Sequence, residues 1–295
     1  MKNALSIDVE DYFQVSAFDG TFSREQWPDL ELRVERNIDR LLDLFDTHRA
    51  RATFFTLGWV AERRPGMIRR IVAAGHEIAS HGMLHQRVTS LSRDAFKADI
   101  QRSKALLEDI SGQQVKGYRA PSYSIGRDNL WALDELSAAG YHYSSSIYPV
   151  RHDHYGMPEA PRFAFSPRDN GLLEIPVSTF VLGGRNYPCG GGGYFRLYPY
   201  AVSRWAIRRV NRRDQQPSVF YLHPWEIDPD QPRVDGIGRK TRFRHYLNLD
   251  RTEARLARLL RDFHWERMDR VYASALERVS AAPPMAELPR RQGAT

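Results

Sequence analysis

The chain has 295 residues, of which 42% are hydrophobic, 12% aromatic and 27% charged, and its formal net charge is +7. A chain of this length and hydrophobic content can bury a sizeable core, either as one large α/β domain or as two smaller ones. Its single cysteine, Cys189, excludes an intrachain disulfide framework and a cysteine-based zinc site, so any metal ligands must be histidines and carboxylates.

The amino-terminal stretch MKNALSIDVEDYF contains no apolar signal core, because carboxylates appear by the eighth residue. No run of 18 or more apolar residues occurs in the sequence, so no membrane-spanning helix is expected. We therefore expect a cytoplasmic protein.

Apolar patterns predict strands and helices that alternate along the chain. One predicted helix has proline in its first turn and glycine after its last, an arrangement typical of helices, and Ser92 is placed to cap another. In chain order, the expected elements are strand 5–7, helix 33–46, strand 52–58, helix 65–75, strand 76–81, helix 92–111, strand 115–121, helix 128–139, strands 141–147 and 172–180, helix 199–210, strand 218–225 and helix 251–263.

This alternation predicts parallel strands joined by helical crossovers. The number of units favours a distorted, incomplete (β/α) barrel over an open doubly wound sheet, and no GxGxxG motif follows the first strand. We expect a single domain over residues 1–280, with a carboxy-terminal extension at about 230–280, and a disordered, proline-rich tail at 281–295. The four-glycine run at 190–193 is expected to be a connector or a loop that approaches a ligand.

Positive charge is concentrated between residues 233 and 261. A solvated helix face with its loop is the simpler interpretation, and a surface for an anionic partner is the alternative. No nucleic-acid-binding motif accompanies the segment, so nucleic acid is not expected as a partner. The basic residues are Arg233, Arg239, Lys240, Arg242, Arg244, Arg251, Arg255, Arg258 and Arg261.

Ionisable side chains follow four of the predicted strands, at the point where each strand ends. Parallel barrels gather functional residues at the carboxyl ends of their strands. Each group alone has a simpler explanation, such as local capping or a buried ion pair, but their shared position predicts one site. The residues are Asp8, Glu10 and Asp11 after the first strand, His81 and His85 after the third, Arg119 and Tyr123 after the fourth, and His223 after the last.

The two histidines of SHGMLH, His81 and His85, can reach one ion from a helical turn or a tight loop. Two histidines and one carboxylate form a three-ligand set that leaves positions open for water and substrate, as in catalytic metal sites. A second carboxylate could then serve as base, an arginine could orient it, and a further histidine could protonate a leaving nitrogen. These parts match metal-assisted hydrolysis of an amide or ester.

The segments SIDVED, SHGMLH, RAPSY and YLHPWE resemble the motifs of polysaccharide deacetylases with a NodB homology domain, carbohydrate esterase family 4, over about residues 3–270. More narrowly, DVEDYFQVSAF, LHPWEID and FRHYLNL resemble the branch found with exopolysaccharide and exosortase gene clusters, near the peptidoglycan deacetylase and allantoinase-like group. The resemblance implies a metal-dependent enzyme that removes N-acetyl groups from N-acetylhexosamine units of a glycan.

In this resemblance, Asp8 matches the catalytic base, Arg119 the arginine that holds the base, and His223 the general acid. His81 and His85 match two metal ligands. The third ligand is Glu10 or Asp11, because Val9 follows Asp8 where the family has two adjacent aspartates. Alternation along a strand favours Glu10, whereas a turn directly after Asp8 would favour Asp11.

The resemblance also assigns a substrate groove. Pro121 and Tyr123 match its motif, the backbone amide near Tyr123 would hold the oxyanion, and Leu222 would line the acetyl pocket. Two departures from the family pattern are visible. Gly82 stands where the family often has Ser or Thr. No aspartate near YHYSSSI is placed to tune His223, so either His223 is less basic than its counterparts or another residue takes the place of the aspartate. Candidate aromatic partners for sugar rings are Tyr123, Trp131, Tyr194, Phe195 and Trp225, with core packing favoured for Trp131.

The ligand set suits Zn²⁺ best, with Co²⁺, Ni²⁺, Fe²⁺ and Mn²⁺ as alternatives. The expected partner is an N-acetylated glycan or a lipid-linked oligosaccharide; the latter would place a cytoplasmic enzyme beside a membrane-bound polysaccharide assembly system. The alternative functions are hydrolysis of a small cyclic amide, as in allantoinase-like enzymes, and glycan binding without catalysis. A binding module has no need for a water-activating set, which disfavours the last. No sequence feature indicates an oligomeric state.

Overall fold

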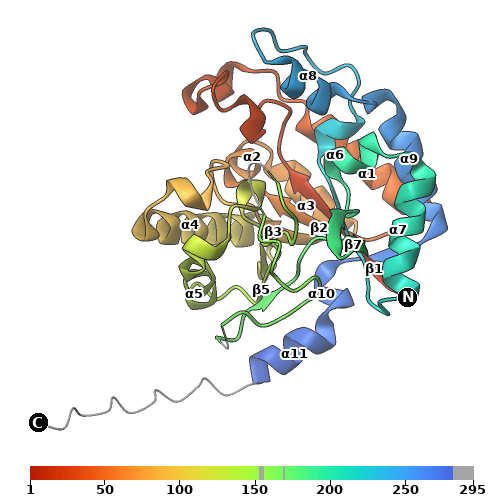
Figure 1. Cartoon of the computed structure of the whole chain (residues 1–295). Coiled ribbons are helices and arrows are strands. Elements are labelled where there is room, and N and C mark those ends of the chain that lie inside the picture. The colour runs from red at the N-terminus through yellow and green to blue at the C-terminus, as the bar shows by residue number, and fades with distance from the viewer. Residues whose placement is uncertain (153–155, 169, 282–295) are drawn as a thin grey trace, which may run out of the picture.

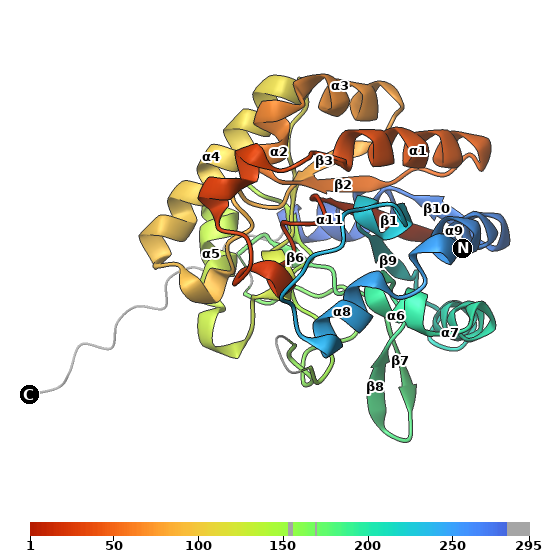
Figure 2. The same ribbon diagram turned by 90° about the horizontal axis from the view of Figure 1, so that it is seen from above.

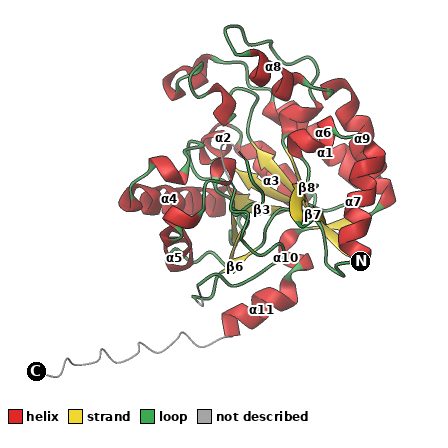
Figure 3. Ribbon diagram, viewed as in Figure 1, coloured by secondary structure: helices red, strands yellow, loops and turns green. Residues whose placement is uncertain are grey.

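The computed structural model describes residues 1–152, 156–168 and 170–281, and its centre is a sheet of short parallel strands surrounded by helices (Figures 1 and 3). The strand order is β10-β1-β2-β3-β4-β5-β6, and β9 also pairs with β1. The strands are β1 (Lys2–Val9), β2 (Thr53–Thr56), β3 (Glu77–Ser80), β4 (Gly117–Tyr118), β5 (Tyr143–Ser144), β6 (Leu173–Glu174), β9 (Val219–Leu222) and β10 (His264–Glu266).

The sheet curls into a half-barrel that stays open on one side. On the edge of β1 away from β2, residues 4–7 pair with β9, and residues 2–4 pair with β10 on the other edge, all in parallel. Within the described residues, β6 and β9 do not pair with each other, so the barrel does not close between them. The expectation of an incomplete barrel of parallel strands is confirmed.

The six predicted helices form as α1, α3, α4, α5, α7 and α9, whereas α2, α6, α8, α10 and α11 were not predicted. In α1, Val34, Ile38, Leu41 and Phe45 are buried at helical spacing, and the Ser92 hydroxyl accepts a hydrogen bond from the Ala95 N–H as predicted for a cap. The helices are α1 (Val34–Thr47), α2 (Gly58–Arg63), α3 (Pro65–Ala73), α4 (Arg93–Ser111), α5 (Trp131–Ala138), α6 (Gly192–Leu197), α7 (Tyr200–Arg212), α8 (Arg239–Tyr246), α9 (Leu249–Asp262), α10 (Met268–Val271) and α11 (Ala273–Ala281). No helix in the described residues is long and apolar enough to span a bilayer.

The predicted strand at 172–180 is two strands with different partners. Its first part is β6 in the parallel sheet, and its last part belongs to β7 (Thr179–Leu182), which pairs antiparallel with β8 (Arg185–Pro188). The β7–β8 hairpin, which the sequence reading did not predict, projects from the body of the molecule next to α7 (Figure 2).

The four-glycine run is not a loop throughout, so the prediction that it contains no regular element was wrong. Gly192 and Gly193 form the first turn of α6. Gly191 has a φ of 114°, and a Cβ at this position would lie 1.9 Å from the backbone oxygen of Tyr221. Glycine is needed here because the chain packs directly against the backbone of β9.

The arginine-rich segment is not a uniformly solvated face either. Arg255 donates hydrogen bonds to the backbone carbonyls of Phe195 and Arg196 at the end of α6, and the Arg258 guanidinium lies 4.6 Å from the ring centre of Tyr200. Several of these cations therefore stabilise the packing of α9. The tail predicted to be disordered lies outside the described residues, apart from Ala281 at the end of α11.

Candidate active site

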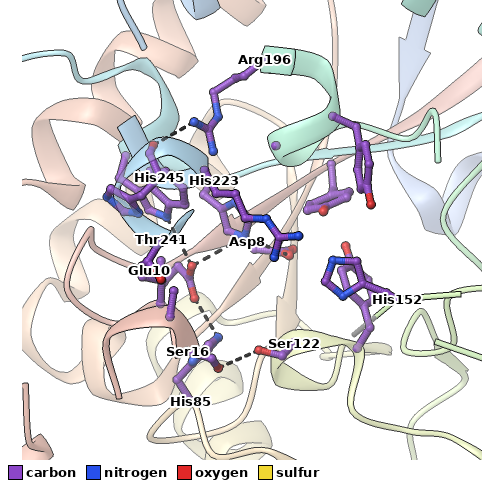
Figure 4. A pocket seen from close by; sticks show the side chains of 18 of the residues that line it. Asp8, Glu10, Ser16, His85, Ser122, His152, Arg196, His223, Thr241 and His245 are labelled. Carbon is purple, nitrogen blue, oxygen red and sulfur yellow. Dashed lines mark hydrogen bonds and ion pairs between the residues drawn. The ribbon is translucent and has the colours of Figure 1, made fainter. Parts of the chain in front are cut away.

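A cavity of about 560 Å³ lies at the carboxyl ends of the central strands (Figure 4). It is lined by Asp8 and Glu10 from the end of β1, by His81 and His85 after β3, and by His223 after β9. The structure thus brings together side chains that are more than 200 residues apart in the sequence, at the edge of the sheet where the strand ends predicted them.

Three of these side chains form a cluster with the composition of a metal site. One potential ligand atom each from Glu10, His81 and His85 lies within 4.8 Å of the other two, and all three residues are buried. His85 Nε2 lies 2.8 Å from Glu10 Oε2. His81 Nδ1 lies 2.7 Å from the backbone oxygen of Arg119. A carbonyl oxygen can only accept, so Nδ1 carries the hydrogen and Nε2 keeps its lone pair, the tautomer expected of a metal-ligating histidine.

Electrostatics favour the ligand forms of these groups. Burial lowers the pKa of His81 to about 4, so its imidazole is neutral at physiological pH. Burial alone would raise the pKa of Glu10, but the neighbouring imidazoles of His85 and His223 outweigh it and bring that pKa to about 2. Metal binding needs neutral histidine and ionised carboxylate, so the donor set fits a divalent cation.

The loop after β3 explains why glycine follows the first histidine. Gly82 has a φ of 76°, and a Cβ there would lie 2.8 Å from Asp99 Oδ2 on α4. The Asp99 carboxylate accepts a hydrogen bond from the Met83 N–H and so holds the start of the loop. A serine or threonine at position 82 would be strained and would collide with this carboxylate.

A buried ion pair orients the second carboxylate. Arg119 is fully buried, and its Nη1 donates to Asp8 Oδ1 at 2.6 Å and to the Ser6 hydroxyl at 2.9 Å. Its Nη2 donates to the Ser145 hydroxyl at 2.9 Å. These contacts fix Asp8 Oδ1, while Oδ2 lies 3.8 Å from Nε2 of His223. Asp8 is thus held as a carboxylate that borders both the metal-ligand cluster and the opposite histidine.

His223 has a carboxylate partner that the sequence reading did not identify. Glu226 Oε1 lies 2.8 Å from His223 Nδ1, and its Oε2 accepts from Arg196 Nε at 2.6 Å. Although burial lowers the pKa of His223, the charges of Glu10 and Glu226 raise it to about 9. The only sequence signal was the three-residue spacing in HPWE, which places both side chains on one turn after β9.

The structure separates Asp11 from the histidines. Its Oδ2 accepts hydrogen bonds from the backbone N–H groups of Arg33 and Val34, and its Oδ1 accepts one from Tyr12. Asp11 therefore satisfies backbone donors at the start of α1, where a carboxylate is favoured. Of the two candidate third ligands, the structure brings only Glu10 to His81 and His85.

This arrangement predicts opposite effects for the two neighbouring acids. Asp11→Ala should lower the free energy of unfolding by at least about 2 kcal/mol, because buried helix-start N–H groups lose their acceptor, with metal binding retained by the folded protein. Glu10→Ala should lose metal binding. Urea unfolding and metal content of both variants check this; loss of metal from folded Asp11→Ala with full metal in Glu10→Ala would reverse the assignment.

The remaining predicted site residues are divided between cavity and core. Tyr123 and Trp225 line the cavity, but Pro121 and Leu222 do not; Leu222 is fully buried in the main core. The Tyr123 N–H donates to the Ala120 carbonyl at 3.0 Å, so this amide is already engaged. Among the other aromatic candidates, Tyr194 lines the cavity, whereas Phe195 packs on Phe220 and Trp131 on Phe96.

The strand ends of the half-barrel carry two histidines and a carboxylate, a buried Asp–Arg pair and an opposing histidine. This arrangement is typical of a metal-dependent hydrolase. Residues 23–144 match the family model described as polysaccharide deacetylase, and residues 145–273 match a domain of unknown function, DUF3473. Residues 23–144 thus form a polysaccharide deacetylase domain, of the NodB and carbohydrate esterase family 4 type, and DUF3473 follows it directly.

Two named relatives and one solved structure are similar to the chain. A peptidoglycan-N-acetylglucosamine deacetylase of Bacillus cereus is 29% identical, and the match covers 40% of this chain and 44% of the relative. A chitooligosaccharide deacetylase of Sinorhizobium fredii is 37% identical, and the match covers 30% of this chain and 42% of the relative. The matches thus span less than half of these relatives. A crystal structure described as a candidate polysaccharide deacetylase from Mycobacterium smegmatis is similar to this chain with a TM-score of 0.62 and 20% sequence identity. The match covers 98% of this chain and 95% of that one, so the two proteins share a fold.

The cavity combines residues from both matched regions and from the segment before them. His81 and His85 line the cavity from the deacetylase match, and His223 lines it from the DUF3473 match. The DUF3473 region therefore contributes to the rim of the cavity that the Glu10, His81 and His85 cluster lines.

Proposed function

We propose that the protein is a metal-dependent N-deacetylase that acts on N-acetylhexosamine units of a glycan. The observation that carries the proposal is the convergence on one cavity of the Glu10, His81 and His85 cluster with Asp8 and His223. The family and the named relatives, which are called deacetylases of peptidoglycan and of chitooligosaccharides, support it.

Glu10, His81 and His85 would hold the cation, most suitably Zn²⁺, with Co²⁺, Ni²⁺, Fe²⁺ or Mn²⁺ as alternatives. When bound, it would lower the pKa of a water molecule toward about 7 and polarise the acetyl carbonyl. With only three protein ligands, the bound cation would keep coordination positions for water and substrate.

Asp8 is the base in this proposal. Its Oδ1 is occupied by Arg119, so Oδ2 accepts the proton of the attacking water. The new bond joins the water oxygen to the acetyl carbon. The guanidinium of Arg119 is fully buried, supplies the counter-charge of the carboxylate and fixes its direction.

His223 is the acid. Its Nε2 faces Asp8 and Glu10 at 3.8 and 3.5 Å, and Glu226 holds Nδ1–H from the other side. Nε2 therefore delivers its proton to the amide nitrogen as the C–N bond breaks, and the products are acetate and a free amine. The Trp225 ring stacks on the imidazole with 18° between the planes and restricts its rotation.

Glu226→Gln tests this role of the His223 partner. Glutamine keeps an acceptor for Nδ1–H but removes the negative charge, so the pKa of His223 should fall. The acid must be protonated, and activity is lost as pH rises through that pKa; the alkaline limb of the kcat profile should therefore move to lower pH by about one unit or more. An unchanged alkaline limb in a folded variant would remove Glu226 from the mechanism.

The cavity walls support a sugar substrate. Tyr123, Tyr194 and Trp225 offer aromatic surface beside the ionisable residues, a combination suited to sugar faces. We propose a polymeric or lipid-linked N-acetylated glycan, the latter in association with a polysaccharide assembly system.

Acetate release from the metal-reconstituted protein tests the proposed reaction. N-acetylated chitooligosaccharides should yield acetate, and the apoprotein should not. Allantoin serves as the parallel substrate for the cyclic-amide alternative. Turnover of allantoin with no acetate from any N-acetylated glycan would replace the proposal, and binding of glycans without turnover would indicate an inactive relative.

A further inference from the structure

Exposed hydrophobic side chains are concentrated around α7 and the hairpin beside it. Among the described residues, seven large hydrophobic side chains are exposed, and five of them lie between positions 182 and 205. Trp205 on the outer face of α7 is 45% exposed, whereas Ala206, Ile207 and Val210 of the same helix are buried. The five residues are Leu182, Tyr187, Leu197, Val202 and Trp205.

The same outer face carries a dense group of arginines. A groove of about 470 Å³ along α7 is lined only by Ala201, Trp205 and the arginines at positions 204, 208, 209, 212 and 213. Arg204 is paired with Asp262 at 3.0 Å. Within the part of the chain that the structure describes, no carboxylate pairs with Arg208, Arg212 or Arg213, so this face presents uncompensated positive charge.

The hairpin extends this face. The ring centres of Trp205 and Phe180 of β7 lie 5.3 Å apart, and Phe180 stacks on Tyr187 of β8 at 5.5 Å. Arg209 also donates a hydrogen bond to the Val181 carbonyl. These contacts hold the hairpin beside α7 (Figure 2), and Leu182 and Arg185 at the turn of the hairpin are exposed. We call the set Leu182, Arg185, Tyr187, Val202, Trp205, Arg208, Arg212 and Arg213 the α7 surface.

We propose that the α7 surface binds the anionic face of a phospholipid bilayer. Exposed tryptophan and aliphatic side chains flanked by arginines are the composition of interfacial membrane-binding surfaces, in which apolar groups enter the headgroup boundary and cations meet lipid phosphates. The proposed contact is at the bilayer interface. The proposal does not depend on the proposed deacetylase function.

This surface adjoins the cavity through α6. Gly193, Tyr194, Arg196 and Leu197 of α6 line the cavity, and α7 begins three residues after Leu197. A protein bound through the α7 surface would therefore hold its cavity close to the lipid headgroups.

Vesicle co-sedimentation tests the proposal. The full chain should bind vesicles of phosphatidylglycerol and phosphatidylcholine, bind pure phosphatidylcholine far more weakly, and dissociate as salt is raised. The combined variant R208Q/R212Q/R213Q should partition to the anionic vesicles about 100-fold more weakly than the parent, because each arginine near the surface contributes about 1 kcal/mol of binding free energy. The matched control R69Q/R251Q/R278Q removes the same charge from other exposed positions and should bind like the parent.

Quenching by brominated lipids adds a second readout. Trp205→Phe keeps a ring against Phe180 and should remove the bilayer-dependent quenching of tryptophan fluorescence. Equal binding to neutral and anionic vesicles, equal losses in both triple variants, or no binding to either vesicle would each overturn the proposal. Binding to a single-stranded or duplex oligonucleotide that displaces the protein from vesicles and needs the same arginines would assign the surface to nucleic acid instead.

Discussion

Replacing His81 by alanine should abolish metal binding and acetate release together. The imidazole is buried, and its Nδ1 is fixed by the Arg119 carbonyl so that Nε2 is available to an ion. Removing even an outer partner of a ligand lowers metal affinity by about 10- to 100-fold, so removal of a ligand itself should exceed about 100-fold. Activity should then fall to the level of the apoprotein at any metal concentration that saturates the parent.

The informative comparison is with a histidine outside the cavity. His48 follows α1 and takes no part in the cluster, so His48→Ala should keep both metal and activity. Metal content by elemental analysis, circular dichroism and acetate release would be measured on both variants. Acetate release from His81→Ala equal to that of the parent would eliminate the proposed site.

Asp8→Asn should separate catalysis from metal binding. Asparagine retains an oxygen for the Arg119 guanidinium, but it cannot take a proton from water. Loss of a general base costs typically about 10²- to 10⁴-fold in rate, and kcat should fall within that range. Metal content should be unchanged, because the cluster that binds the ion consists of Glu10, His81 and His85.

The asparagine substitution also leaves buried Arg119 without its counter-charge, so the unfolding midpoint must be recorded alongside the rate. A folded, metal-loaded Asp8→Asn enzyme with near-parental kcat would show that another group accepts the proton. A variant that loses metal in proportion to activity would instead make Asp8 part of the ion's environment.

The sequence predicted those parts of the fold that depend on local pattern. The stripe of α1 and the Ser92 cap of α4 have their signals within a few residues, and both are confirmed. The lengths of β4, β5 and β6 were overestimated, because the paired length depends on how neighbouring strands diverge in a distorted barrel. The β7–β8 hairpin was not predicted because the sequence of β8, RNYP, has the pattern of a loop, and only its pairing with β7 makes it a strand.

At the site, both the position of residues along the strands and the alternation of side chains along β1 were informative. The strand ends correctly indicated that Asp8, Glu10, His81, His85 and His223 would share one cavity. Alternation favoured Glu10, and the hydrogen bonds of Asp11 to the start of α1 explain why Asp11 points away. Glu226 was missed because the expected partner of His223 was sought in a different strand, whereas the chain supplies one from the next turn.

A crystal of the protein soaked with Zn²⁺ and measured at the zinc absorption edge would test the account most directly. We expect one strong anomalous peak in the cavity, at about 2.0–2.2 Å from a carboxylate oxygen of Glu10 and from one nitrogen each of His81 and His85. No peak at these three side chains under saturating zinc, or a peak bound to Asp11 in place of Glu10, would contradict it.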